Sequence, residues 1–271
     1  MSFSRSFGAL LLVAPALASA QKLDRTVEPP PTAPKALHVP TWTHTTLANG
    51  AELVVTPKKD LPLVTFTINF VGGANQYEAP GKAGVAGMTA QMLREGTSTK
   101  TGDQLSDAFE LLGVGGFGSG VGSESGSVGF TATKAQFVPT LALLADVIEH
   151  PSFPADAVER LRGQSLVNLV QGKDQPTVIA SNVFSRTLYG AEHPYGRTET
   201  EESIKSITRD DIVAFHKAYY TPGHAVISVA GDVDAGAVKA QVEKALADWK
   251  GTGGRPSFSY PAVPARSATA I

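Results

Sequence analysis

The chain has no cysteine and no excess of charge of either sign. Disulfide bonds, cysteine-ligated zinc sites and a thiol nucleophile are therefore excluded. Lys and Arg number 23 against 25 Asp and Glu, so the net charge of −2 makes nucleic acid a poor candidate partner. Beyond the first twenty or so residues, no apolar run is long enough to cross a bilayer.

Several motifs that carry chemistry are also missing. The sequence contains neither a Gly-x-Ser-x-Gly nucleophile turn nor a Gly-Lys-Ser/Thr phosphate loop. No two histidines are three or four residues apart, so no helix face presents a pair of imidazole ligands. We expect His193 to structure a loop and His216 to serve in packing or capping. The histidines are His38, His44, His150, His193, His216 and His224.

The N-terminus has the pattern of an export signal. A basic Arg5 precedes a short apolar run, and Ala18-Ser19-Ala20 follows as a small-residue cleavage site. Residues 1–20 are therefore predicted to be a signal peptide, and the protein to be periplasmic if its source is a Gram-negative bacterium. The proline-rich stretch 21–40 is expected to be an extended leader.

Alternating apolar residues predict the strands of the folded part, which begins near Trp42. The pair Asn49-Gly50 between two short runs is typical of a β-hairpin. The stretch 63–71 places every second apolar side chain on one face and predicts a strand with a buried side. Strands are expected over residues 44–47, 52–55, 63–71, 127–132 and 224–230.

Apolar residues at helical spacing predict the helices. Thr208 is the expected N-cap of one of them, with Asp210 and Asp211 in its first turn. The mixed order of strands and helices indicates an α+β fold. Helices are expected over residues 84–95, 101–112, 134–149, 154–173, 177–189, 208–220 and 234–249.

The chain contains eight short strings, in this order: Leu47–Gly50, Gly84-Val85-Ala86, Gly96-Thr97, Leu143–Asp146, His150–Phe153, His193–Gly196, Phe215–Pro222 and Ile227–Asp232. In their order and spacing they resemble the pitrilysin/insulinase (M16-type) family of zinc peptidases, and its bacterial and mitochondrial-processing branch in particular. The resemblance covers about residues 43–249. It implies the N-terminal half of a clamshell metallopeptidase, two-layered, with a mixed or antiparallel sheet packed by helices.

The family's first half carries a helix with His-x-x-Glu-His, in which both histidines bind zinc and the glutamate activates a zinc-bound water. A distal glutamate is the third ligand. Aligned on Gly84 and on Gly96-Thr97, the ligand positions of this chain hold Gly87 and Gln91, and the base position holds Ala90. Asn168 stands at the distal ligand position. None of these residues supplies a zinc ligand or a base, so no catalytic residue and no bound zinc are expected.

The glycine-rich stretch 113–122 has two open interpretations. The resemblance implies an edge strand that pairs with an extended peptide, and glycine lets a second backbone approach closely. The alternative is a flexible loop without a ligand. The candidate peptide-binding residues are Gly116, Phe117, Gly118 and Ser119.

The resemblance implies a non-catalytic homologue that binds peptide and pairs with a separate zinc-bearing peptidase subunit. Two alternatives stay open. One is an active zinc metalloendopeptidase with an unrecognised site, and the other is a peptide-binding scaffold that acts alone. Residues 41–250 are expected to form the pitrilysin-like domain, with 203–250 resembling the start of the second family region. Residues 251–271 are expected to be a linker and the start of a truncated second half.

Overall fold

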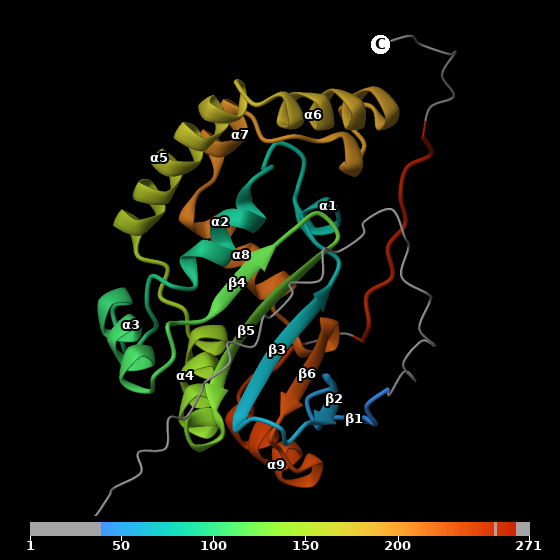
Figure 1. The fold of residues 1–271 in the computed structure, drawn as a ribbon. Coiled ribbons are helices and arrows are strands. Elements are labelled where there is room, and N and C mark those ends of the chain that lie inside the picture. The colour runs from blue at the N-terminus through green and yellow to red at the C-terminus, as the bar shows by residue number, and fades with distance from the viewer. Residues whose placement is uncertain (1–38, 252–253, 264–271) are drawn as a thin grey trace, which may run out of the picture. The chain divides into compact units, whose positions relative to one another are not determined.

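The computed structural model of the chain describes residues 39–251 and 254–263, shown in Figure 1. The predicted signal peptide, nearly all of the leader, and the start of a second half at 266–271 lie outside the described residues. The folded unit begins at Pro40. Among the described residues, no helix combines the length and the apolar character needed to span a bilayer.

Six strands form one sheet in the order β1-β2-β6-β3-β5-β4. The pairing of β2 with β6 is parallel, and the other four pairings are antiparallel. Strands β1 and β4 are therefore the two edges of the sheet. The bounds are β1 Thr43–Thr46, β2 Glu52–Pro57, β3 Leu63–Val71, β4 Gly118–Val121, β5 Ser125–Thr133 and β6 Ala225–Gly231.

The helices follow most of the predicted ranges. Two short helices, α1 and α7, were not expected from the sequence, and α9 ends at Ala245 rather than at Trp249. The α-helices are α1 Ala74–Tyr77, α2 Val85–Met92, α3 Gly102–Leu111, α4 Phe137–Glu149, α5 Ala155–Gly172, α6 Pro176–Tyr189, α7 Glu201–Ser206, α8 Arg209–Tyr219 and α9 Ala235–Ala245.

The early end of α9 has a packing cause. The side chain of Trp249 is 3% exposed, and its Nε1 donates a hydrogen bond of 2.9 Å to the Tyr220 carbonyl. The chain leaves the helix at Leu246, and the turn that follows places this large ring in the core.

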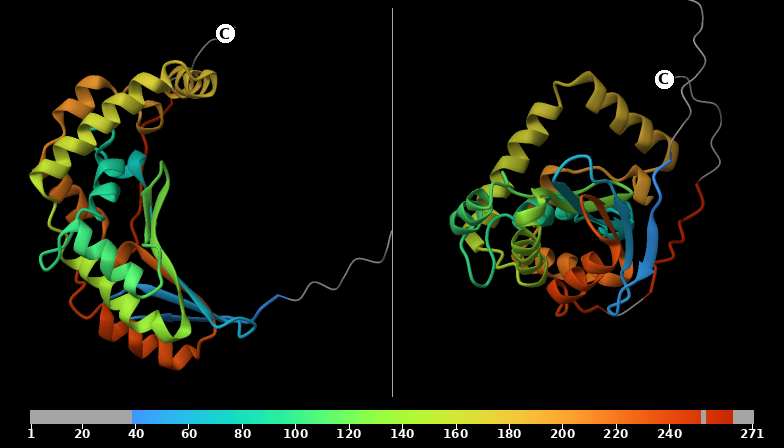
Figure 2. Two further views of the ribbon diagram at one scale, coloured as in Figure 1. Left: turned by 60° about the vertical axis from the view of Figure 1, so that its left-hand side comes forward. Right: turned by 60° about the horizontal axis from the view of Figure 1, so that its bottom comes forward.

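Helices cover one face of the sheet, as the left view of Figure 2 shows. Strand β3 illustrates the alternation: Val64, Phe66, Ile68 and Phe70 are buried against the helices, and the residues between them face the other way. The side chains on that second face are mostly small and polar. Thr65 Oγ1, for example, is hydrogen-bonded to Thr131 Oγ1 on β5 at 3.0 Å.

Helices α5 and α6 lie beyond the end of the sheet where β4 turns into β5 (Figure 1). Only the first half of α5 is packed into the core, through Ala157, Val158 and Leu161. Helix α6 buries none of its residues.

Candidate functional site

Helix α2 is held in place at both ends. Its N-cap Gly84 has φ 103°, a left-handed conformation that favours glycine, and Glu78 Oε1 accepts the N–H groups of Gly84 and Ala86 at 2.9 and 3.0 Å. Beyond the C-terminal end, Thr97 Oγ1 donates to Asp146 Oδ2 on α4 at 2.7 Å. Met88, in the middle of the helix, and Met92, its last residue, are buried in the core.

The residues predicted to stand at the family's chemical positions offer no reactive group. A Cβ at Gly87 would meet no atom within 4 Å, and Ala90 is buried with its carbonyl accepting the Ser119 hydroxyl at 2.7 Å. Gln91 is exposed, and its amide nitrogen donates to the Gly87 carbonyl at 3.4 Å. Asn168 lies on α5, which contacts α2, and its Oδ1 accepts from Gln164 at 2.9 Å.

This donor set does not fit zinc. Glycine and alanine supply no ligand atom, and the two neutral amides are already engaged with neighbours on their own helices. Among the described residues, no group of three or more His, Cys, Asp or Glu side chains could hold a metal ion.

Two carboxylates that were not predicted from the sequence as site residues, Glu78 and Glu199, lie beside Gly87. A pocket of 230 Å³ is lined by Gly87, Glu78, Glu199 and Arg197, among others. Burial raises the pKa of Glu78 to about 7, aided by the charge of Glu199 and opposed by the Gly84 and Ala86 N–H groups and by Arg197. Burial also raises the pKa of Glu199. The main role of Glu78 in the described structure is to cap α2.

The glycine-rich stretch contains β4, one of the two edge strands of the sheet. Among the described residues, β4 pairs with β5 alone. Gly118 and Ser119 lie in this strand. Gly116 and Phe117 were expected in this strand but precede it. Phe117 is instead buried against Phe109, with ring centroids 5.3 Å apart. The candidate edge is Gly118–Val121.

The histidines have local structural roles. His193 Nδ1 accepts the Tyr195 N–H at 3.1 Å, and its Nε2 lies 3.2 Å from the Pro261 carbonyl, which confirms a loop-structuring role. The ring of His216 stacks on Tyr220 at 5.1 Å, as expected of a packing histidine. His38 lies outside the described residues.

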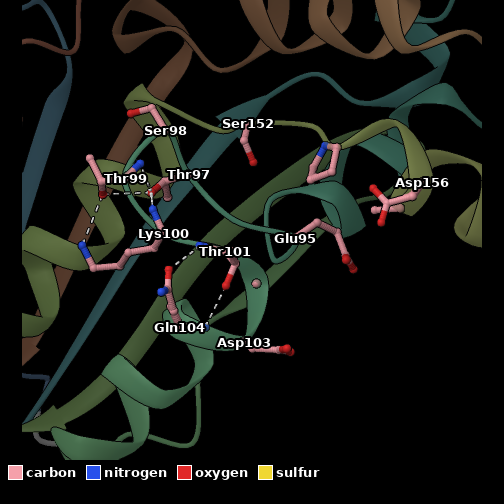
Figure 3. A pocket seen from close by; sticks show the side chains of 13 residues that line it. Glu95, Thr97, Ser98, Thr99, Lys100, Thr101, Asp103, Gln104, Ser152 and Asp156 are labelled. Carbon is pink, nitrogen blue, oxygen red and sulfur yellow. Dashed lines mark hydrogen bonds between the residues drawn. The ribbon is translucent and has the colours of Figure 1, made fainter.

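A separate polar pocket of 570 Å³ lies past the C-terminal end of α2 (Figure 3). Its groups bond mainly to one another: Thr97 Oγ1 and Thr99 Oγ1 are 3.2 Å apart, and Thr101 caps α3 through the Gln104 N–H at 3.3 Å. Such satisfied groups stabilise the chain turn and do not indicate a ligand site.

Two family profiles match the chain. Residues 54–197 match "Insulinase (Peptidase family M16)", and residues 206–270 match "Peptidase M16 inactive domain". Among curated proteins, the uncharacterized zinc protease YmxG of Bacillus subtilis is 25% identical over 223 residues, which are 80% of this chain and 52% of that protein. The chain spans about half the length of the first curated relatives it matches.

Solved structures have the same fold. The peptidase M16 inactive domain from Pseudomonas fluorescens superposes with a TM-score of 0.75 at 29% identity, covering 82% of this chain and 54% of that one. The first half of the periplasmic protease PqqL from Escherichia coli superposes with a TM-score of 0.69 at 17% identity, covering 83% of this chain and 49% of that one. The predicted fold, one α+β half of a clamshell, is confirmed.

Proposed function

This chain belongs to the insulinase family of peptidases, peptidase family M16, and we propose that within it the chain is a non-catalytic member. It binds a peptide while a separate, zinc-bearing subunit of the same family cuts. The observation that carries this proposal is the joint replacement of both histidine ligands, the base and the distal glutamate by Gly87, Gln91, Ala90 and Asn168.

In this proposal, α2 has lost the residues that would bind zinc and activate water, and it has kept the residues that fix its ends and its packing. Helix α2 keeps its left-handed Gly84, and Gly96 has φ 119° in the turn after the helix. Met88 and Met92 stay buried on the core side. A helix that keeps its start, its end and its packing while all four chemical groups are replaced supports retention for a role other than cutting.

The peptide-binding part of the proposal rests on β4. As an edge strand it has backbone N–H and C=O groups on its outer side that an extended peptide can pair with. A Cβ at Gly120 would meet no atom within 4 Å, and one at Gly118 would meet a single carbonyl at 3.8 Å, so side chains do not obstruct the strand there. The Ser119 hydroxyl holds the strand against α2.

The pairing part rests on an exposed apolar surface of α5 and α6, here called the arm surface. Helix α6 has no buried residue, yet much of it is apolar. Apolar side chains this exposed, on a helix with no buried residue, are typical of protein–protein contact. The arm surface comprises Val167, Val170, Val178, Ile179, Val183, Phe184 and Leu188, which are 37% to 61% exposed.

The last part of the proposal is that the protein is exported. Residues 1–20 have the pattern of a signal peptide, and one structural neighbour is described as a periplasmic protease. A periplasmic protein from a Gram-negative source is the form that we propose.

Pairing is tested by mixing the chain with a His-x-x-Glu-His homologue from the same organism and measuring sedimentation. We expect a complex of the two chains, and Phe184→Asp should weaken it by about tenfold or more because a charge then enters an apolar contact. Leu111→Asp on α3 is the matched control, since Leu111 is 87% exposed and lies off the arm surface.

Two results would count against the proposal. If no complex forms with any such homologue, the scaffold that acts alone becomes the better account. If Leu111→Asp weakens the complex as much as Phe184→Asp, the arm surface is not the contact.

A further inference from the structure

A second pocket, of 390 Å³, lies among the C-terminal end of α4, helix α8 and the residues that follow α9. It is distinct from α2 and β4, and the proposed function does not use it. Aromatic rings form much of its wall, with Phe153 beside His216 at 5.4 Å between ring centroids and the Trp249 indole bonded to the Tyr220 carbonyl. Its size is ordinary for a small-molecule site, and its wall combines aromatic rings with polar and charged side chains.

Polar groups without partners gather at this pocket. Among the described residues, four buried side-chain atoms have no hydrogen-bond partner, and the residues that carry them all line the pocket. Buried polar atoms in folded proteins are nearly always paired, so four exceptions at one place need a cause. The atoms are Glu149 Oε1, His216 Nε2, Tyr220 Oη and Thr221 Oγ1.

Two of the four atoms are hydrogen-bond acceptors. Burial lowers the pKa of His216 to about 4, against the opposing effect of the hydrogen-bonding Ile148 carbonyl, so the ring is neutral at neutral pH. An imidazole whose N–H faces that carbonyl presents Nε2 as an acceptor. The Glu149 carboxylate accepts as well, and the hydroxyls of Tyr220 and Thr221 can donate or accept.

The charges around the pocket leave the Glu149 carboxylate without a close cationic partner among the described residues. Arg209 is committed to the Phe153 and Ser152 carbonyls at 2.8 and 3.0 Å, and Lys250 lies 3.9 Å from Asp248. Lys217 is exposed at the rim, and His150 Nδ1 is 4.0 Å from Glu149 Oε2. Burial raises the pKa of Glu149, and the negative charges of Asp248 and Asp146 add to that effect, while His150 and a hydrogen bond from the Trp249 backbone oppose it.

We propose that this pocket binds a small organic cation that carries a primary ammonium group. The ammonium donates to Glu149 and to His216 Nε2, one hydroxyl of Tyr220 or Thr221 accepts its third N–H, and the carbon chain lies against the aromatic wall. An ammonium has three donors and no acceptor, which matches a set of two acceptors and two adaptable hydroxyls.

Neighbouring atoms cover the four polar atoms in the described structure. Binding of the ammonium at these atoms therefore requires side chains of the pocket to rotate. The Glu149 carboxylate, at the last position of α4, and the Thr221 hydroxyl can each turn about a single bond without moving the backbone.

The test uses the full chain and three probes of similar size: butylammonium, butan-1-ol and butyrate. The observable is the ring ¹⁵N chemical shift of His216. We expect butylammonium to shift the Nε2 resonance in a saturable manner, and the neutral and anionic probes to cause no saturable shift. Glu149→Gln should weaken butylammonium binding by about tenfold or more, because a charge-assisted hydrogen bond is lost.

Glu110→Gln on α3 is the matched control, since Glu110 is exposed and its substitution should leave binding unchanged. Tyr220→Phe keeps the stacked ring and removes only the hydroxyl, so a moderate loss of affinity is expected while the fold is kept. Equal shifts with all three probes, no saturable shift with butylammonium, or an unchanged affinity in Glu149→Gln would each overturn the inference.

Discussion

Helices α2 and α6 have opposite relations to the core. Six of the eight residues of α2 are buried, whereas none of the fourteen residues of α6 is. The sequence of α2 is therefore explained by packing inside the chain, apart from the positions where relatives would carry chemistry. The apolar residues of α6 are not explained by packing among the described residues, and the pairing proposed above would account for them.

The largest change is expected from returning ligands to α2. If the helix keeps the geometry of a zinc site, the triple variant Gly87→His, Gln91→His and Asn168→Glu should bind close to one equivalent of zinc, because two imidazoles and a carboxylate then face one ion. Zinc content after dialysis measures this.

The control for that experiment is the double variant Gln91→His and Asn168→Glu, which keeps Gly87. It lacks one ligand and should retain far less zinc. Equal zinc in the two variants would show that positions 87, 91 and 168 do not face a common point, and that the correspondence with the family's zinc helix is wrong.

The next largest effect compares truncations on the two helices. Met92→Ala on α2 removes a fully buried side chain and should lower the free energy of unfolding by about 2–5 kcal/mol. Phe184→Ala on α6 removes a side chain that is 61% exposed and should change it by less than about 0.5 kcal/mol. Urea unfolding of both variants is the measurement, and similar losses would break the comparison.

A smaller effect concerns pH and the start of α2. The pKa of Glu78 is raised from 4.5 to about 7 in the folded chain, so the folded state binds a proton more tightly than the unfolded state. Its contribution to stability is thus complete below about pH 4.5 and is lost as the pH rises through about 7, by at most about 3 kcal/mol.

Glu78→Gln should remove that part of the pH dependence, and Glu110→Gln should not. Urea midpoints at about pH 5 and about pH 8 make the comparison. If the urea midpoint changes with pH by the same amount in the wild-type chain and in the Glu78→Gln variant, the pKa of Glu78 is not raised in the folded chain.

The smallest effect is at the contact between α2 and the edge strand. Ser119→Ala removes the hydrogen bond to the Ala90 carbonyl and should cost about 0.5–1.5 kcal/mol. Ser127→Ala on the open face of the sheet, where Ser127 is exposed, is the control and should be nearly neutral. Equal costs would mean that this bond does not hold β4 against α2.

Local patterns predicted much of the fold. Strand β3 has the predicted bounds, because its alternation is uninterrupted over 63–71. Thr208 caps α8 as expected and accepts the Asp211 N–H at 3.1 Å. The helix over 201–206 was missed although Thr200 caps it, because six residues are too few to show helical periodicity.

Long-range features could not be predicted from the sequence. The parallel pairing of β2 with β6 joins residues far apart in the chain, and no local pattern encodes it. The role of Glu78 depends on a side chain that reaches the start of α2, and the pocket at Tyr220 depends on three separate segments. The replaced positions on α2 could be assigned only because flanking glycines resemble those of the family.

The central claim, that this member of the family does not cut peptides by itself, has one most direct measurement. The purified chain is assayed for bound zinc and for cleavage of a broad peptide mixture, with and without a chelator, alone and with a His-x-x-Glu-His homologue. We predict no bound zinc and no chelator-sensitive cleavage by the chain alone, and cleavage when the homologue is present. Chelator-sensitive cleavage by the chain alone would contradict the account.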